Sequence, residues 1–166
     1  MQMLVATASL VNGGTLVDPT LIRTVSRTPS GNGCTVISAG TSFQMRYLLR
    51  LNALEGSARR AEALAKGYRL GGKTGTAEKV VRGRYSKELV TTFFSSVFPL
   101  DDPRYAMLIV VDEPKPEGSG VGRTAAYNAG DVTGRIIARI APMLGVLPND
   151  WQNFSLAEAR AAGEQG

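Results

Sequence analysis

The stretch Leu70-Gly71-Gly72-Lys73-Thr74-Gly75-Thr76-Ala77-Glu78-Lys79 decides the fold, because it predicts a strand at the edge of a sheet. Six of its residues comprise three glycines, two threonines and one lysine, between strand-like flanks at 68–70 and 80–81. Glycine inside a strand offers no side chain to pack and often marks a place where another backbone comes close. We therefore expect an edge strand that receives an extended ligand by main-chain pairing.

The side chains of this stretch favour an anionic ligand. Lys73 supplies a cation, and Thr74 and Thr76 supply hydroxyl donors, a combination that suits a carboxylate. A glycine-rich hairpin strand without chemistry is the plainer alternative.

A phosphate-binding loop is a third alternative, because Gly67-x-x-x-x-Gly72-Lys73-Thr74 fits its pattern letter for letter. Such a loop needs an apolar strand before it and a helix that opens directly after Thr74. Residues 57–66 are instead charged and helix-favouring, and Gly75 follows Thr74. The context therefore disfavours a nucleotide-binding protein.

Composition sets further limits. The 166 residues are 43% hydrophobic and predict one globular domain, residues 1–147, followed by a flexible tail, residues 148–166. The net charge is +5, but the basic residues are scattered, so no nucleic-acid partner is expected. With no histidine and one cysteine, the sequence predicts no metal site, cofactor or intrachain disulfide. We find no run of 18 apolar residues and no export signal.

The hydrophobic periodicity predicts an α+β fold, an antiparallel sheet with flanking helices. Besides the strand above, we expect strands at 35–38, 90–98 and 105–111, the last buried on both faces. Helices are expected at 1–11, at 41–54 from a capping box at Thr41 and Gln44, and at 128–144 with an end or bend at Pro142.

Two of these helices have expected core stripes. The first comprises Phe43, Tyr47, Leu48, Leu51 and Leu54, with Arg46 and Arg50 outside; the second comprises Val132, Ile136, Ile137, Ile140 and Leu144.

The connecting segments are less informative. Residues 57–66 predict a short helix or a connector, and residues 82–87 a polar loop that could rim a cleft. Asp112, Glu113 and Lys115 stand near a strand end and could line a site, although charged loop residues are usually solvated. The segment Ser30-Gly31-Asn32 predicts a turn.

The triplet Lys73-Thr74-Gly75, on the first of the last three strands, resembles the third motif of penicillin-recognising serine transferases. The whole order of elements resembles the C-terminal half of a penicillin-binding transpeptidase domain. Five segments, together within roughly residues 1–150, resemble the class B, division-specific transpeptidases of the FtsI type: residues 8–16, 67–84, 98–105, 111–116 and 134–146. The resemblance implies part of the fold that penicillin-binding proteins share with β-lactamases.

The resemblance also implies an activity. In this family a serine of an upstream Ser-x-x-Lys motif attacks a D-Ala-D-Ala stem peptide or a β-lactam, and a second stem peptide releases the acyl-enzyme as a cross-link. Lys73 resembles the cleft lysine, and Thr74, Gly75 and Thr76 resemble the residues that bind the substrate's carboxylate. The backbone N–H of Thr76 matches one oxyanion donor, worth about 3 kcal/mol in the transition state.

The sequence departs from the family in two places. No Ser-x-x-Lys occurs in it, and the nearest match, Ser57-Ala58-Arg59-Arg60, ends in an arginine, which cannot act as a general base. Asn128-Ala129-Gly130-Asp131 stands where the family more often has Ala-Pro, which predicts a looser helix start. Without the serine and its base, acyl transfer lacks its covalent step, so we expect the chain alone to be inactive.

Two hypotheses follow from the resemblance. The first is a fragment of a serine D,D-transpeptidase, because the chain starts inside a helix. The second is a non-catalytic module that binds stem peptide or pairs with a separate N-terminal half. The implied partners are peptidoglycan stem peptides, β-lactams, the N-terminal half of the domain and other division proteins. The implied location is the periplasmic face of the inner membrane, in cell-wall synthesis at the septum.

Overall fold

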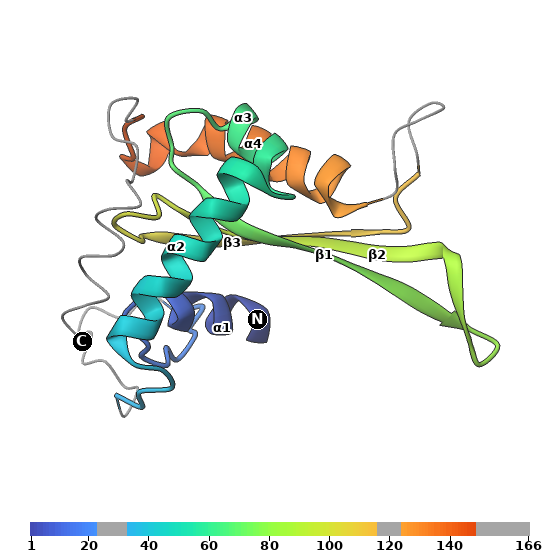
Figure 1. Ribbon diagram of the computed structural model, residues 1–166, viewed down its shortest axis with the longest axis horizontal. Coiled ribbons are helices and arrows are strands. Elements are labelled where there is room, and N and C mark those ends of the chain that lie inside the picture. The colour runs from blue at the N-terminus through green and yellow to red at the C-terminus, as the bar shows by residue number, and fades with distance from the viewer. Residues whose placement is uncertain (23–32, 116–123, 149–166) are drawn as a thin grey trace.

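The computed structural model describes residues 1–22, 33–115 and 124–148 (Figure 1). The predicted turn at 30–32 and all but the first residue of the predicted tail lie outside these residues. The helices are α1 (Gln2–Val11), α2 (Ala39–Glu55), α3 (Arg59–Leu64) and α4 (Ala129–Ile140), with short 3-10 helices η1 (Ala125–Tyr127) and η2 (Pro142–Leu144). The strands are β1 (Gly71–Val81), β2 (Arg84–Phe98) and β3 (Tyr105–Asp112).

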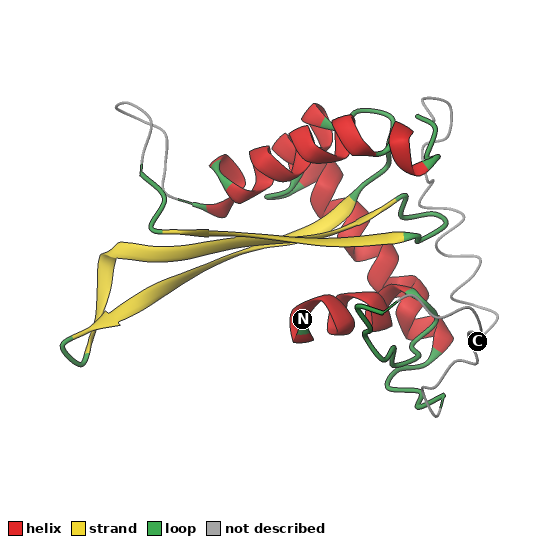
Figure 2. Ribbon diagram, turned by 180° about the vertical axis from the view of Figure 1, so that it is seen from behind, coloured by secondary structure: helices red, strands yellow, loops and turns green. Residues whose placement is uncertain are grey.

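The three strands form one antiparallel sheet in the order β1-β2-β3, so β1 lies at an edge as predicted. Helices α3 and α4 lie on one side of the sheet and α1 lies on the other (Figure 2). Helix α2 crosses the sheet near the start of β1 (Figure 1). The predicted α+β class, an antiparallel sheet with flanking helices, is confirmed.

The hairpin β1–β2 is longer than predicted. Its turn consists of Arg82 and Gly83, whose φ angles of 52° and 78° suit a two-residue turn that follows the strand twist. Residues 84–87 therefore belong to β2, and the predicted polar loop at 82–87 is wrong. The far part of this hairpin extends beyond the helices (Figure 1).

The start and the buried face of α2 differ from prediction. The helix begins at Ala39, and the Ser38 hydroxyl caps it by accepting the N–H of Thr41 at 3.0 Å, so Thr41 is not the cap. The expected apolar stripe is wrong at two of its five positions, because Leu48 and Leu54 are 52% and 43% exposed. Arg50, expected outside, is instead buried. This face of α2 meets the main chain at the start of β1, where polar side chains find partners.

The main core lies between the sheet and the helices α3 and α4. Its largest fully buried members are Phe94, Phe98, Leu70 and Ile137. Strand β3 contributes only one face to it, since Val110 is 56% exposed, so burial on both faces is wrong.

The remaining predictions outside the site are partly confirmed. The expected strand at 35–38 is reduced to a single bridge between Thr35 and Thr15. Helix α4 ends before Pro142 as predicted, but Val132 and Leu144 of its expected stripe are exposed. The start of α4 is attached to β2, because the Asn128 side chain accepts a hydrogen bond from Thr92 of β2 at 2.6 Å.

Helix α4 packs closely against α3 at Gly134. A Cβ on Gly134 would lie 2.5 Å from the Ala61 carbonyl oxygen and 2.8 Å from the Leu64 Cβ. Both atoms are fixed to the α3 backbone, so the helices would have to separate.

We therefore expect Gly134→Ala to lower the free energy of unfolding by about 1–3 kcal/mol, although alanine favours helix by about 1 kcal/mol. Denaturant unfolding followed by circular dichroism would measure it. Arg135→Ala on the exposed side of α4 is the matched control and should be nearly neutral. An equally stable Gly134→Ala variant would show that α3 and α4 do not pack this closely in solution.

Candidate functional site

The start of the β1 edge is covered by side chains of α2 and α3. The Leu70 carbonyl accepts a hydrogen bond from Arg50 Nη1 at 2.8 Å, and the Leu70 N–H donates to Glu62 Oε2 at 3.2 Å. The Gly72 carbonyl accepts from Asn52 Nδ2 at 2.7 Å. Main-chain groups of Leu70 and Gly72 therefore face away from β2, and the helices satisfy them.

The edge opens after Gly72. In a strand that pairs on one side, alternate residues turn their N–H and C=O outward, so the next outward residues are Thr74 and Thr76. The Thr74 carbonyl accepts a hydrogen bond from Lys73 Nζ at 2.8 Å. The Thr76 N–H, the expected oxyanion donor, thus faces away from β2 at the edge of the sheet that the described residues form.

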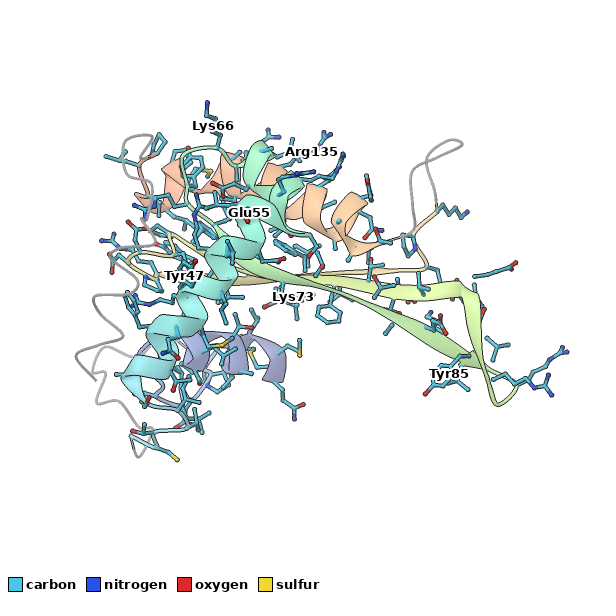
Figure 3. The ribbon with its side chains drawn as sticks, viewed as in Figure 1. Tyr47, Glu55, Lys66, Lys73, Tyr85 and Arg135 are labelled. Carbon is cyan, nitrogen blue, oxygen red and sulfur yellow. The ribbon has the colours of Figure 1, made fainter. Side chains whose placement is uncertain are left out.

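The predicted site side chains flank this edge from both faces of the sheet. Lys73 pairs with Ser95, whose hydroxyl lies 2.7 Å from that of Thr7 on α1, so Lys73 is on the α1 face. Lys73 is exposed near the start of β1 (Figure 3). Thr74 and Thr76 are on the opposite face.

The two threonine hydroxyls have partners on that face. Thr74 Oγ1 lies 2.7 Å from Ser57 Oγ. Thr76 Oγ1 accepts a hydrogen bond from the Ala125 N–H at 3.4 Å. The structure therefore brings a cation, two hydroxyls and an outward N–H to one short segment of an open edge.

The glycines of this strand have a reason within the chain itself. A Cβ on Gly75 would lie 2.1 Å from Phe93 Cζ, and one on Gly72 would lie 2.6 Å from the Ser95 carbonyl oxygen. The β2 backbone thus requires glycine at position 72, and the Phe93 ring occupies the space that a side chain at position 75 would need, independently of any ligand.

The charged residues at the end of β3 pair with β1. Lys79 Nζ lies 2.8 Å from Asp112 Oδ2 and 2.8 Å from Glu113 Oε1, and Thr91 donates to Asp112 at 2.7 Å. The hydrogen bond from Lys79 lowers the pKa of Asp112, and the hydrogen bond to Asp112 raises the pKa of Lys79. These carboxylates, predicted as possible site residues, instead hold Lys79 across the sheet, and Lys115 is exposed.

Sequence reasoning missed the polar residues that build this edge, namely Arg50, Asn52, Ser57 and Glu62. The available signal was an arginine between leucines, Leu49-Arg50-Leu51, because an arginine in an apolar stripe needs a buried acceptor.

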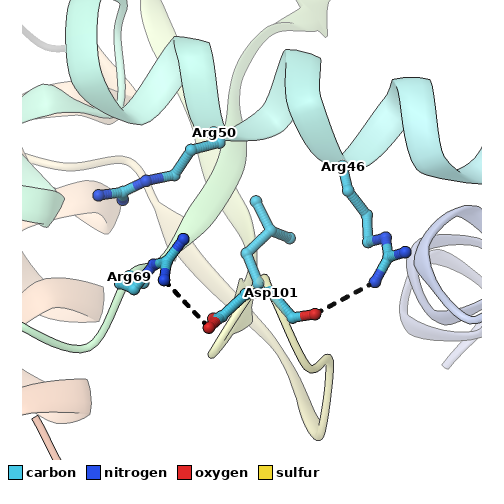
Figure 4. Close-up of a pocket in the computed structure, with 5 residues that line it drawn as sticks. Arg46, Arg50, Arg69 and Asp101 are labelled. Carbon is cyan, nitrogen blue, oxygen red and sulfur yellow. Dashed lines mark hydrogen bonds and ion pairs between the residues drawn. The ribbon is translucent and has the colours of Figure 1, made fainter. Parts of the chain in front are cut away.

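A small cavity lies beside the Arg50 side chain (Figure 4). It is lined by Arg46, Arg50, Arg69, Leu100 and Asp101 and has a volume of about 10 Å³, room for roughly one water molecule. Arg69 Nη1 lies 3.1 Å from Asp101 Oδ2, and Arg46 donates to the Asp101 carbonyl at 3.4 Å. The cavity is too small for a peptide, and its ion pair joins Arg69, just before β1, to Asp101 in the turn between β2 and β3.

The phosphate-loop alternative is wrong. Thr74 lies inside β1, which continues to Val81, and no helix opens after it.

Among the residues that the structure describes, no helix is both long and apolar enough to cross a membrane.

The glycine-rich edge strand of this antiparallel sheet carries Lys-Thr-Gly, a motif of β-lactamases and penicillin-binding proteins. The model of the penicillin-binding protein transpeptidase domain matches residues 1–140, and the chain belongs to this family. It is 37% identical over 157 residues to stage V sporulation protein D of Bacillus subtilis, covering 89% of this chain and 23% of that protein. It is also 37% identical over 147 residues to a probable peptidoglycan D,D-transpeptidase FtsI of Caulobacter vibrioides, covering 83% of this chain and 25% of that protein.

Solved structures agree on the fold. The transpeptidase domain of Burkholderia pseudomallei penicillin-binding protein 3 superposes with a TM-score of 0.75 and 29% identity, over 89% of this chain and 43% of that one. Penicillin-binding protein 3 of Mycobacterium tuberculosis, in complex with ampicillin, gives 0.74 and 24% identity, over 92% of this chain and 36% of that one. The chain thus spans about a quarter of the length of the two curated relatives above. The resemblance to FtsI-type transpeptidases is confirmed.

Proposed function

We propose that the chain forms one wall of a peptidoglycan D,D-transpeptidase active site, the wall that binds the carboxylate end of a stem peptide. The observation that carries this proposal is the edge of β1, which Lys73 flanks on one face of the sheet and Thr74 and Thr76 flank on the other. The names of the FtsI relatives support the reaction, and the ampicillin complex of the M. tuberculosis protein shows that a protein of this fold binds a β-lactam.

Each group has a proposed role. The ammonium of Lys73 attracts the terminal carboxylate of the substrate, and the hydroxyls of Thr74 and Thr76 donate hydrogen bonds to it. The main chain of β1 pairs with the extended peptide, and the Thr76 N–H donates to the carbonyl oxygen as negative charge develops there. Gly75 keeps the strand bare of a side chain between the two threonines. The serine nucleophile and its lysine come from outside this sequence, which contains no Ser-x-x-Lys.

The surroundings of the site are proposed from the same comparison. Residues 1–147 form the C-terminal portion of a transpeptidase domain, and the N-terminal half of that domain completes the cleft. Met3 on α1 and Leu48 and Leu54 on α2 are exposed apolar residues and are proposed as individual contacts for this half. We propose that the complete protein acts on the periplasmic face of the inner membrane with other division proteins.

Removal of the Lys73 ammonium should weaken binding of a peptide that ends in D-Ala-D-Ala. We expect Lys73→Ala to raise the Kd at least about tenfold, because a charge-assisted hydrogen bond contributes about 1.5–3 kcal/mol. A titration of diacetyl-Lys-D-Ala-D-Ala followed by NMR would measure it. Lys66→Ala is the matched control, since Lys66 is also exposed but lies away from β1 (Figure 3). Equal, negligible binding by wild type and Lys73→Ala would refute the proposal.

The isolated chain should not form a stable covalent adduct with penicillin, because its sequence has no Ser-x-x-Lys to supply the attacking oxygen. Incubation with a fluorescent penicillin, followed by denaturing electrophoresis and intact-mass measurement, would test this. A stoichiometric mass increase would show that another residue of the chain is acylated by the penicillin.

The same missing motif favours a second function, a non-catalytic module that binds stem peptide through the same edge.

A further inference from the structure

We infer that Ser57, held by Asn52, is a positioning residue that orients the Thr74 hydroxyl toward the substrate carboxylate. This inference rests on the proposed function, because it assigns a task to a group beside the proposed carboxylate site. It follows from a hydrogen-bonded link between the end of α2 and the edge of β1.

The Asn52 side chain uses both ends of its amide. Its Nδ2 donates to the Gly72 carbonyl at 2.7 Å, while its Oδ1 accepts from the Ser57 N–H at 3.1 Å and from the Ser57 hydroxyl at 3.3 Å. Ser57 Oγ in turn lies 2.7 Å from Thr74 Oγ1. The Asn52 amide thus fixes the position of the β1 main chain at Gly72 and the position of the Ser57 hydroxyl, which contacts Thr74.

The residue directly before Ser57 must be glycine. A Cβ on Gly56 would lie 2.1 Å from Asn52 Oδ1 and 2.9 Å from the Asn52 carbonyl oxygen. Without a glycine the chain could not turn tightly enough around Asn52 to bring Ser57 to β1. The segment 52–57 is therefore built around the Asn52 amide.

The protons of this link can be counted. Each hydroxyl has one proton and can also accept, so the short Ser57–Thr74 hydrogen bond can run in either direction. If Ser57 donates to Asn52, Thr74 must donate to Ser57 and has no proton left for a ligand. When a carboxylate arrives, Thr74 donates to it and Ser57 turns its proton to Thr74 Oγ1.

Two consequences follow from this reversal. Asn52 Oδ1 keeps its hydrogen bond from the Ser57 N–H, so it is not left without a donor. The donated bond from Ser57 also polarises the Thr74 hydroxyl and holds it in one orientation, which strengthens its bond to the carboxylate.

The experiment compares the Kd of two peptides for wild type, Ser57→Ala and Ser57→Thr, by NMR titration. The first peptide is diacetyl-Lys-D-Ala-D-Ala with its free carboxylate, and the second is the same peptide as a C-terminal amide. We expect Ser57→Ala to raise the Kd of the carboxylate peptide about 3–10-fold, the worth of one hydrogen bond, and to leave the amide peptide unchanged. Ser57→Thr keeps the hydroxyl and should stay within about twofold of wild type.

Three other outcomes are decisive. If Ser57→Ala binds the carboxylate peptide as tightly as wild type, the inference is overturned while the proposed function stands. If both peptides lose the same affinity, Ser57 has only a structural role and the inference is again overturned. If the folded wild type binds neither peptide, the proposed function fails, and the inference fails with it. Circular dichroism melting of each variant shows whether the fold is retained.

Discussion

Replacement of Arg50 by methionine is expected to destabilise the chain by about 3–5 kcal/mol, the usual cost of removing one partner of a buried ion pair. The Arg50 Nη1 lies 2.8 Å from Glu62 Oε2, and the two side chains are only 10% and 17% exposed. Methionine keeps much of the aliphatic volume but leaves the Glu62 carboxylate without its cation. It also removes the donor to the Leu70 carbonyl, which belongs to a fully buried residue.

The double variant Arg50→Met/Glu62→Gln separates charge from packing. Glutamine is neutral and keeps an oxygen that can accept the Leu70 N–H. We expect the double variant to be about 1–3 kcal/mol more stable than Arg50→Met alone, because no buried charge is left unpaired.

Guanidinium unfolding of the three proteins, with the exposed Arg59→Met as control, would measure both effects. A single variant as stable as wild type would show that Arg50 is solvated and does not clamp β1.

Replacement of Phe94 by alanine is expected to cost about 3–5 kcal/mol, since it opens a cavity in the main core. Phe94 is fully buried between the sheet and the helices, and it pairs with Thr74 across β1 and β2. Its ring also lies against Gly72, where a Cβ would come within 2.7 Å of Phe94 Cζ. Loss of the ring therefore removes both core packing and the support beneath the site.

Phe93→Ala is the matched control for Phe94→Ala. Phe93 points to the other face of β2 and is only partly buried, so its loss should cost clearly less. Phe94→Leu should cost less than about 1.5 kcal/mol, because leucine fills most of the volume. Thermal and urea unfolding would rank the three variants. A larger loss of stability in Phe93→Ala than in Phe94→Ala would show that the two faces of β2 are assigned the wrong way round.

The sequence predicted the strands of the sheet better than the helix faces. Residues 70–81 could be assigned to an edge strand because the strand-like flanks and the glycines between them carry local preferences. The hairpin of β2 and β3 could be assigned from the prolines and aspartates of its turn. The burial of Arg50 and the exposure of Leu48 could not be predicted, because both depend on what α2 meets across the fold.

The site divides in the same way. Lys73, Thr74, Gly75 and Thr76 were identified from a contiguous pattern, whose spacing along one strand sets their relation to the edge. Ser57 was noted only as an incomplete Ser-x-x-Lys, and Asn52 was not noted at all. Their contacts with Thr74 and Gly72 join residues 17 and 20 positions apart, which no local pattern encodes.

The amino-acid sequence by itself determined the elements, the edge strand and the chemical character of the site, because strand alternation and turn preferences act between near neighbours. The tertiary structure alone decided which main-chain groups of β1 are covered and which stay open. Arg50, Asn52 and Glu62 close the edge as far as Gly72, and Thr74 and Thr76 face outward beyond it. The reason is physical: an outward N–H or C=O must find a partner, and only packing of α2 and α3 against β1 determines where those partners end.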